Sequence, residues 1–439
     1  MAGKSIGGLV FAGFMCGTSL DGVDGALIRI RDGAISLVAF DHHPFPVEVT
    51  GWIRHYLSGT AGGLSALEHW GDLENLMART ETLLLERLLS ISGLMPEEIH
   101  GAGTHGITAF HRPSPHRAPW AKRSAEPEEL PGISLQIANP YPLAQRFRIP
   151  VVFDFRRADV SRKGEGAPLA SLFHRAVFSD LHEPRAFLNL GGIANLTYLP
   201  ALSDPETGMI AFDTGPGNML LDLHVSRMTH GRETFDREGQ RSAGGQVRRS
   251  VLSFILDDPW FALPPPKSTG REEWGEERLD SLISHLSLHE AVEETDLLAS
   301  LAEATACSIQ KGLEWLSPRP CLLIAGGGGT RNPDLMGRIA RIANIPVRPS
   351  EAFGWPAQAI EPMAFAYLAA LSLSGRPGSL PGTTGADAPV LTGAVAPPPD
   401  GSLPARLQEI REAADIHLPF PDRANPLPFP LPGSGSPVF

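Results

Sequence analysis

Two glycine-rich hairpins constrain the fold of this chain more than any other feature of its sequence. The first joins the apolar runs 9–15 and 23–30 through the turn at 17–22. The second spans 186–199 and turns at 191–192. Because apolar runs joined by glycine-containing turns are typical of antiparallel strands, we expect a β-hairpin at each place. The recurrence of this layout in the second half of the chain indicates two related halves.

Outside the hairpins, helical and strand-like patterns alternate. Apolar residues recur at helical spacing over 64–89 and 301–316. Short apolar runs that predict buried strands occur at 149–155, 209–213 and 321–325. A helix is expected from residue 219, and another from Pro333 with Asn332 as its N-cap. Strands that alternate with helices favour a layered α/β fold.

Two segments are rich in proline. Residues 111–132 contain five prolines among mixed charges and are predicted to form a surface loop. Residues 397–439 contain eleven prolines, interrupted by a short helical patch at 405–414. We expect this tail to be an extended wrap or a disordered end rather than a domain.

The balance of charges excludes some classes of partner. Acidic residues number 49 and basic residues 37, for a net charge of −12, which disfavours a nucleic-acid partner. The sequence has no run of 18 apolar residues, so it predicts no membrane-spanning helix and no membrane partner.

The cysteines point away from disulfide and metal chemistry. Cys16, Cys307 and Cys321 are odd in number and far apart, and the sequence has no CxxC pair. Phe14 and Met15 are too large for the cleavage site that precedes a lipidated cysteine. We therefore predict a cytoplasmic protein with neither a disulfide framework nor a thiolate metal site.

Some motifs mislead. Residues 101–106 fit G-x-G-x-x-G, but a proline-rich stretch follows where a dinucleotide fingerprint requires a helix. The Lys-Ser-Thr run at 267–269 lacks the glycine-rich start of a P-loop. No HExxH occurs, and the histidines show no ligand spacing.

The turn of the first hairpin is more informative. Its glycines let backbone N–H groups converge on an anion, and Thr18 and Ser19 add hydroxyl donors. Asp21 and Asp24 would repel a bare phosphate, but they suit a hydrated Mg²⁺ between carboxylate and phosphate. The alternative is a plain hairpin with a glycine turn.

Two further glycine-rich segments follow strands. Asp213 ends the predicted strand 209–213 and precedes the bend 215–217, where a carboxylate can act as a general base. The alternative is that Asp213 only caps the next helix. The glycine run 326–329 would let a ligand lie flat on the backbone, or it is only a tight bend. Together, these features are the layout of the actin-like fold of sugar kinases, heat-shock ATPases and actin.

From about residue 9 to residue 394, the chain resembles the anhydro-N-acetylmuramic acid kinases of bacterial cell-wall recycling. The phrases that carry the resemblance are 14–24 (FMCGTSLDGVD), 103–106 (GTHG), 135–140 (LQIANP), 154–159 (DFRRAD), 164–169 (GEGAPL), 188–195 (LNLGGIAN), 212–218 (FDTGPGN), 267–271 (KSTGR), 325–328 (AGGG) and 361–366 (EPMAFA). The sequence departs from the family's usual residues at Cys16 (Ser), Ile107 and Glu165 (Gln) and Ala138 (Gly), and its loop after His111 is longer.

The resemblance implies an α/β, two-domain actin-like ATPase (sugar kinase) fold with an interdomain cleft. Residues 1–160 would form the N-terminal domain, 161–396 the C-terminal domain, and 397–439 a tail. It implies ATP and Mg²⁺ as cofactors, with no protein residue assigned as a metal ligand. The ATP-binding residues would be Gly17, Thr18, Ser19, Leu20, Asp21, Gly22, Val23 and Asp24, with adenosine near Gly326, Gly327 and Gly328.

The resemblance also implies a reaction and its residues. Asp213 would be the catalytic base, and Glu361, His105 and Asn139 would contact the substrate. The family opens a 1,6-anhydro ring with water and phosphorylates O6, giving N-acetylmuramate 6-phosphate. The partner would be a small amino sugar, and a homodimer is a further possibility. Alternatives are another sugar kinase, an ATPase that only switches shape, and a glycosidase that works without ATP.

Overall fold

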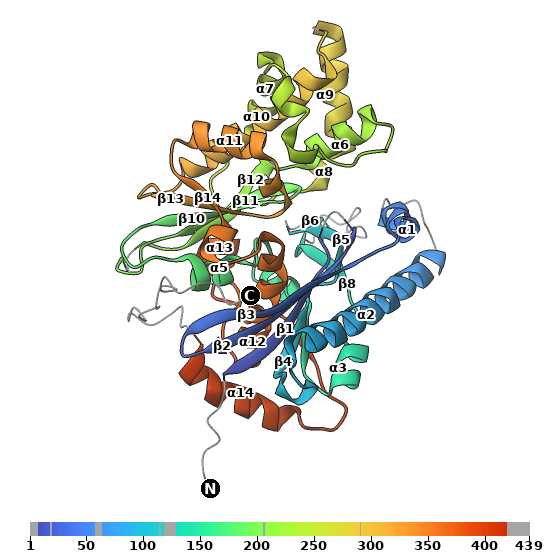
Figure 1. Ribbon diagram of the computed structural model, residues 1–439, viewed down its shortest axis with the longest axis vertical. Helices are drawn as coiled ribbons and strands as arrows, with labels where there is room; N and C mark the ends of the chain where they lie inside the picture. Colours follow the sequence, from blue (N-terminus) through green and yellow to red (C-terminus); the bar gives the residue numbers. More distant parts are fainter. Residues whose placement is uncertain are drawn as a thin grey trace.

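The computed structural model describes residues 8–17, 20–57, 64–113, 116–117, 129–204, 207–289 and 291–418. Its two principal sheets lie in different halves of the molecule (Figure 1). The first sheet has the strand order β15 (Ala394–Ala396), β9 (Val151–Phe153), β4 (Gly101–Thr104), β1 (Leu9–Met15), β2 (Gly22–Arg31) and β3 (Ala34–Pro44). The second has the order β12 (Ile210–Pro216), β11 (Ile193–Leu199), β10 (Arg185–Leu190), β13 (Leu322–Gly326) and β14 (Val347–Pro349).

The two sheets repeat one topology. Numbered along the chain within each sheet, the first five strands of both lie in the order third, second, first, fourth, fifth. In each, the first two strands form an antiparallel hairpin and the fourth pairs in parallel with the first. Both predicted hairpins are therefore confirmed. This duplicated α/β arrangement is that of a two-domain sugar kinase of the actin-like class, as the sequence predicts.

Alternation along β1 explains how the first sheet is covered on both faces. Leu9 and Phe11 belong to a core cluster that contains the residues of α12 (Ile360–Leu373). Val10 and Ala12 point the other way, into a cluster with the buried side chains of α2 (Leu64–Ser92). Because successive strand residues face opposite sides, one apolar strand supports two helical layers.

The second sheet is covered in the same way. Leu188 of β10 packs into a cluster with residues of α6 (Met219–Met228), α7 (Arg249–Leu256) and α10 (Glu294–Leu313). Its neighbour Phe187 packs instead into the cluster of α12, together with residues of α5 (Ser171–Phe178). One apolar core thus joins the two halves of the molecule.

Helix α12 lies unusually close to the first sheet. A Cβ at Gly13 of β1 would lie 1.9 Å from the Pro362 carbonyl oxygen, and one at Gly103 of β4 would lie 2.3 Å from that of Phe365. Gly13 and Gly103 are direct partners in the sheet. Only glycine permits this approach, which fixes the position of Glu361 at the start of the helix.

The remaining elements complete the layers. Asn332 caps α11 as predicted, because its side-chain oxygen accepts a hydrogen bond from the Leu335 N–H at 2.9 Å. The other helices are α1 (Val47–Leu57), α3 (Tyr141–Phe147), α4 (Arg157–Ser161), α8 (Arg271–Trp274), α9 (Glu276–His289), α11 (Pro333–Ala343), α13 (Pro381–Thr384) and α14 (Leu403–His417).

The predicted loop at 111–132 is partly strand. β5 (Ile107–Arg112) pairs with β8 (Ile133–Ile137), and β6 (His116–Arg117) pairs with β7 (Glu129–Leu130). Residues 114–115 and 118–128 of this segment lie outside the described residues.

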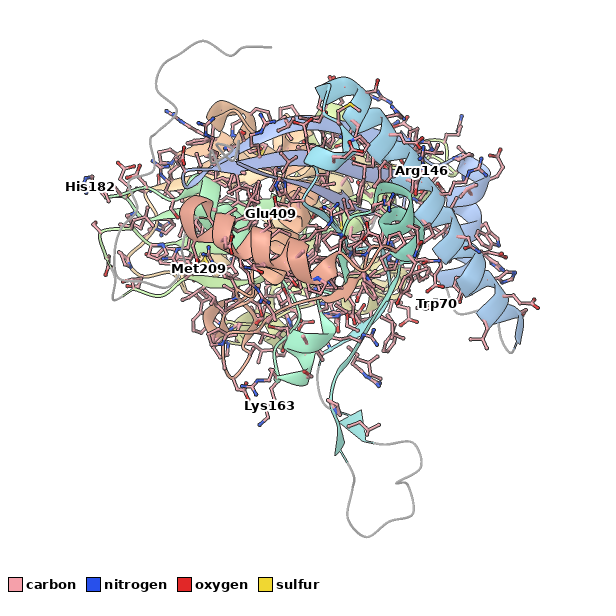
Figure 2. The ribbon with its side chains drawn as sticks, turned by 90° about the horizontal axis from the view of Figure 1, so that it is seen from below. Trp70, Arg146, Lys163, His182, Met209 and Glu409 are labelled. Atoms are coloured by element: carbon pink, nitrogen blue, oxygen red, sulfur yellow. The ribbon has the colours of Figure 1, made fainter. Side chains whose placement is uncertain are left out.

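The helical patch predicted at 405–414 within the tail is confirmed, and it extends over residues 403–417. They form α14, whose Ile410, Ala413 and Ala414, with the C-cap residue Leu418, are buried in the cluster of α12. Figure 2 shows α14, marked by Glu409 on its outer surface, lying across one end of the molecule. Residues 419–439 of the tail lie outside the described residues.

The division predicted at residue 160 also differs from the packing. Helix α12 covers the first sheet and β15 extends it, although both lie within 161–396. The chain therefore returns to its N-terminal half after building the second sheet. Among the described residues, no helix is long and apolar enough to cross a membrane.

Candidate active site

Asp213 lies in the middle of β12, not at its end, because this strand continues to Pro216. Its side chain is 6% exposed, and its Oδ2 accepts a hydrogen bond from the Thr269 N–H at 2.9 Å. Its backbone N–H donates to the Lys267 carbonyl oxygen, also at 2.9 Å. Helix α6 begins with Asn218 as its N-cap residue, so these contacts do not support the reading of Asp213 as a helix cap.

Burial gives Asp213 the acid–base properties of a general base at neutral pH. Loss of water raises the pKa of this carboxyl to about 7, against the lowering effects of the Thr269 N–H and of the charges on Arg156 and Lys267. The nearby negative charge of Glu165 raises the pKa further. A base with a pKa close to the working pH is available in its ionised form and still accepts a proton readily.

Arg156, the residue before α4, connects the candidate residues. Its Nε donates to Nε2 of His105 at 2.9 Å, and its Nη1 donates to the Gly166 carbonyl oxygen at 2.6 Å. Burial lowers its pKa to about 10, while the charges of Asp213 and Glu361 raise it. At this value Arg156 is a cation at neutral pH, and it faces two candidate carboxylates.

His105 is held as a neutral ring. It is buried, and burial together with the Arg156 charge holds its pKa well below the usual range. Since Nε2 accepts from Arg156, Nδ1 carries the proton and donates to the Gly106 carbonyl oxygen at 3.1 Å.

Glu361 lies near both the first hairpin and the glycine run 326–329. It accepts a hydrogen bond from the Asn189 side chain at 3.2 Å, at the end of β10. Burial raises the pKa of Glu361, Asn189 lowers it, and the charges of Asp24 and Arg156 act on it in opposite directions. Asn189 also lies directly beside Gly326 in the parallel pair of β10 and β13.

The predicted ATP segment is described except for Thr18 and Ser19, which lie outside the described residues. Gly22 is tightly enclosed, because a Cβ there would lie 2.4 Å from the His43 carbonyl oxygen. Asp24 accepts a hydrogen bond from Nδ1 of His42 at 2.8 Å. Burial raises the pKa of Asp24. The charge of Arg331, just after the glycine run 326–329, lowers this pKa. The hairpin and this run are thus near one another.

The glycine run at the end of β13 has a conformation that requires glycine. Gly327 has a φ of +84°, and a Cβ there would lie 2.5 Å from Oδ1 of Asn189. A Cβ at Gly328 would meet nothing within 4 Å, so the backbone there borders open space. Within this run, the backbone is exposed to a ligand at Gly328.

Asn139 is not brought to the others by any hydrogen bond among the described residues. Its Oδ1 accepts from the Tyr141 N–H at 3.3 Å, at the start of α3. The backbone near Asn139 does approach the backbone near His105. A Cβ at Gly106, the residue after His105, would lie 2.3 Å from the carbonyl oxygen of Ile137, two residues before Asn139.

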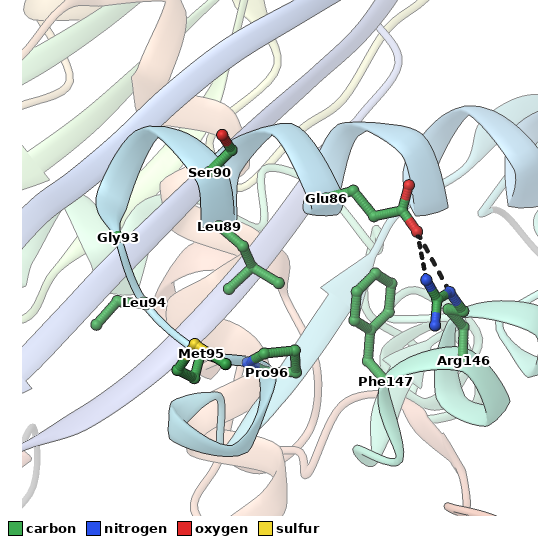
Figure 3. A pocket seen from close by; sticks show the side chains of 9 residues that line it. All are labelled: Glu86, Leu89, Ser90, Gly93, Leu94, Met95, Pro96, Arg146 and Phe147. Atoms are coloured by element: carbon green, nitrogen blue, oxygen red, sulfur yellow. Dashed lines mark hydrogen bonds and ion pairs between the residues drawn. The ribbon is translucent and has the colours of Figure 1, made fainter.

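A surface pocket lies away from these residues, between the end of α2 and α3 (Figure 3). Glu86 and Arg146 form an ion pair at 3.0 Å on one side of it, and Met95 lines another. None of the residues predicted for the site lines this pocket.

Several residues at the site were not assigned a role from the sequence. Arg156, Glu165, Asn189 and Lys267 all contact or face the predicted residues. The Lys-Ser-Thr run at 267–269 is not part of a P-loop, but the Lys267 carbonyl oxygen accepts a hydrogen bond from the Asp213 N–H. Their sequence signal is that each lies within a phrase that carries the family resemblance, although at Glu165 the family usually has Gln.

The predicted ATP segment offers two carboxylates, Asp21 and Asp24, to a magnesium ion. Among the residues that the structure describes, no three histidine, cysteine, aspartate or glutamate side chains gather in a metal-binding group. Mg²⁺ commonly uses one or two carboxylates plus substrate phosphates. Asp24, half-buried in the hairpin strand, and the exposed Asp21 are the carboxylates of the ATP segment.

Comparison with known proteins shows the family to which the chain belongs. The profile of the family described as "Anhydro-N-acetylmuramic acid kinase" matches residues 9–398. Curated proteins of that name from Xylella fastidiosa and Bordetella pertussis are 36% and 37% identical over 392 and 393 residues, covering 88% and 89% of this chain and 96% of each relative. The solved xylulose kinase from Rhodospirillum rubrum aligns with 92% of this chain and 97% of its own, with 15% identity and a TM-score of 0.38, too low to bear on function. The chain belongs to the anhydro-N-acetylmuramic acid kinase family.

Proposed function

We propose that this chain uses ATP and water to convert 1,6-anhydro-N-acetylmuramic acid into N-acetylmuramate 6-phosphate, with Asp213 as the general base. The observation that carries the proposal is the buried Asp213 carboxyl with a pKa of about 7, oriented by the Thr269 N–H and facing Arg156. Family membership supplies the substrate.

The bonds change as follows. Asp213 takes a proton from a water molecule whose oxygen attacks the anomeric carbon, and the bond from that carbon to O6 breaks. O6 then attacks the γ-phosphorus of ATP, and ADP leaves. The products are N-acetylmuramate 6-phosphate, ADP and one proton, so atoms and charge balance.

Other residues bind and orient the substrates. The backbone of 17–24 would hold the phosphates, and Gly326–Gly328 would border the adenosine. Glu361, oriented by Asn189, and neutral His105, oriented by Arg156, would contact the sugar. Asp21 or Asp24, through water, would hold Mg²⁺, which neutralises charge on the transferring phosphate.

The three cysteines are free, which supports a reducing, cytoplasmic location. We also propose a homodimer, which light scattering of the purified chain would test.

The deciding experiment incubates the protein with Mg-ATP and the anhydro sugar in H₂¹⁸O and identifies the product by mass. We expect a sugar 6-phosphate that carries ¹⁸O at the anomeric carbon. A phosphorylated product with an intact ring would indicate another sugar kinase. ATP turnover that ignores the sugar would indicate a nucleotide switch, and ring opening without ATP would indicate a glycosidase.

A further inference from the structure

We propose that Glu165 is a positioning residue for Asp213: it holds the 267–269 segment that clasps the base, and it places a second negative charge beside it. This inference rests on the proposed role of Asp213.

Residues 267–269 enclose Asp213 from both sides. The Lys267 carbonyl oxygen accepts from the backbone N–H of Asp213, and the Thr269 N–H donates to Oδ2 of its side chain. The hydroxyl of the intervening Ser268 donates a hydrogen bond to the Glu165 carboxylate. Glu165 therefore holds Ser268, the middle residue of the 267–269 segment, in place.

Glu165 is itself fixed by its neighbours. Its backbone N–H donates to the Thr384 carbonyl oxygen at 2.6 Å. The next residue, Gly166, donates its N–H to Oδ2 of buried Asp159 at 2.8 Å and accepts from Arg156. A Cβ at Gly164 would lie 2.1 Å from the same Asp159 oxygen. Residues 164–166, which we call the strap, therefore have little freedom to move.

Several charged groups surround Asp213 and Glu165, and the test must separate their effects from that of Glu165 itself. Asp213 faces the cations Arg156 and Lys267 and the anion Glu165. Glu165 faces Asp159 as well as Ser268, and burial raises its pKa. Arg156 also faces Glu361, and His111 of β5 lies against the strap beside Gly166. Arg156 acts on the base and also binds the Gly166 carbonyl oxygen beside Glu165, so substitutions must be isosteric.

Two substitutions divide the role into charge and position. Glu165→Gln keeps an oxygen that can accept from Ser268 but removes the negative charge. Ser268→Ala keeps the charge of Glu165 but removes the hydrogen bond that holds the 267–269 segment. Glu86→Gln, which alters a surface glutamate paired with Arg146, is the matched control.

The first measurement is independent of activity. The full-length protein is labelled with ¹³C at aspartate carboxyls, the Asp213 signal is assigned by its loss in Asp213→Asn, and its titration midpoint is recorded. In Glu165→Gln we expect the midpoint to fall by about one pH unit, because a neighbouring like charge disfavours ionisation. Glu86→Gln should leave it unchanged. An unchanged midpoint in Glu165→Gln would overturn the proposal even if the protein had no kinase activity.

The second measurement uses turnover of the anhydro sugar. In Ser268→Ala we expect kcat to fall roughly tenfold with KM for ATP unchanged, because only the orientation of the base is disturbed. Wild-type kcat in this variant would also overturn the proposal. Failure of the wild-type enzyme to act on the sugar would instead count against the proposed function, while the titration still decides the role of Glu165.

Discussion

The Nε of Arg156 lies 2.9 Å from Nε2 of His105, so one half-buried cation fixes the tautomer of a neutral histidine. This contact joins the 103–106 phrase to the 154–159 phrase. The charge of Arg156 also acts on Asp213 and Glu361, where it lowers the pKa of each carboxyl against the larger effect of burial.

Removing the positive charge of Arg156 should raise the pKa of the Asp213 carboxyl. In Arg156→Met we expect the Asp213 pKa to rise above its value of about 7, because one of the two cations that lower it is lost. The acidic limb of the kcat profile should move to higher pH. Arg146→Met, on the surface, is the control. A limb that stays in place or moves to lower pH would contradict the placement of Arg156 beside the base.

Asp213→Asn should remove proton acceptance and keep the shape of the site. The amide oxygen can still accept from the Thr269 N–H, so nucleotide binding should persist. We expect kcat to fall by about 10²–10⁴, as is typical when a general base is lost. Turnover of the anhydro sugar and ATP binding are measured on the same folded sample. Near-normal turnover would rule out the assignment.

The same substitution should change stability with a definite sign. The folded-state pKa of Asp213, about 7, lies above the ordinary value of 3.8, so its contribution to stability is complete below about pH 4 and is lost as pH rises through 7. At pH 8 that loss amounts to at most about 4 kcal/mol. Asp213→Asn should therefore unfold at higher temperature than the wild type at pH 8, and show less gain at pH 5. Melting curves at both pH values check the sign, and a larger gain at pH 5 would contradict it.

Truncation should separate α14 from the residues that follow it. Ending the chain after Leu418 should leave folding and activity intact. Ending it after Ala396 removes the buried Ile410 and Leu418 and uncovers part of the α12 core. Burial of two such side chains contributes about 3 kcal/mol or more. We expect the shorter protein to be largely insoluble or to melt at much lower temperature. Equal melting temperatures for both truncations would contradict the packing of α14.

Close packing of α12 should make Gly13 irreplaceable. In Gly13→Ala the new methyl would meet the Pro362 carbonyl oxygen at 1.9 Å, so the helix must move and Glu361 with it. We expect a loss of about 3 kcal/mol and a raised KM for the sugar. Gly51→Ala in α1, where a Cβ meets nothing within 4 Å, is the control and should stabilise by about 0.5–1 kcal/mol. Similar melting temperatures for the two variants would show that α12 can yield.

Local features of this protein could be determined from the sequence alone. The two hairpins and the capped start of α11 are confirmed, because turn glycines, apolar alternation and an N-cap asparagine act over a few neighbouring residues. The family phrases singled out Asp213, Glu361 and His105, which the structure connects through Arg156.

What required the tertiary structure is the set of contacts between distant segments. Arg156, Glu165 and Lys267 are polar residues whose importance comes only from what lies across from them, and no periodicity in the sequence records that. The packing of α14 and the return of α12 to the first sheet likewise depend on the burial of apolar surface between segments far apart in the chain. Local propensity fixes hydrogen bonds between near neighbours, whereas the pKa of Asp213 is set by desolvation and by charges that only the folded chain brings together.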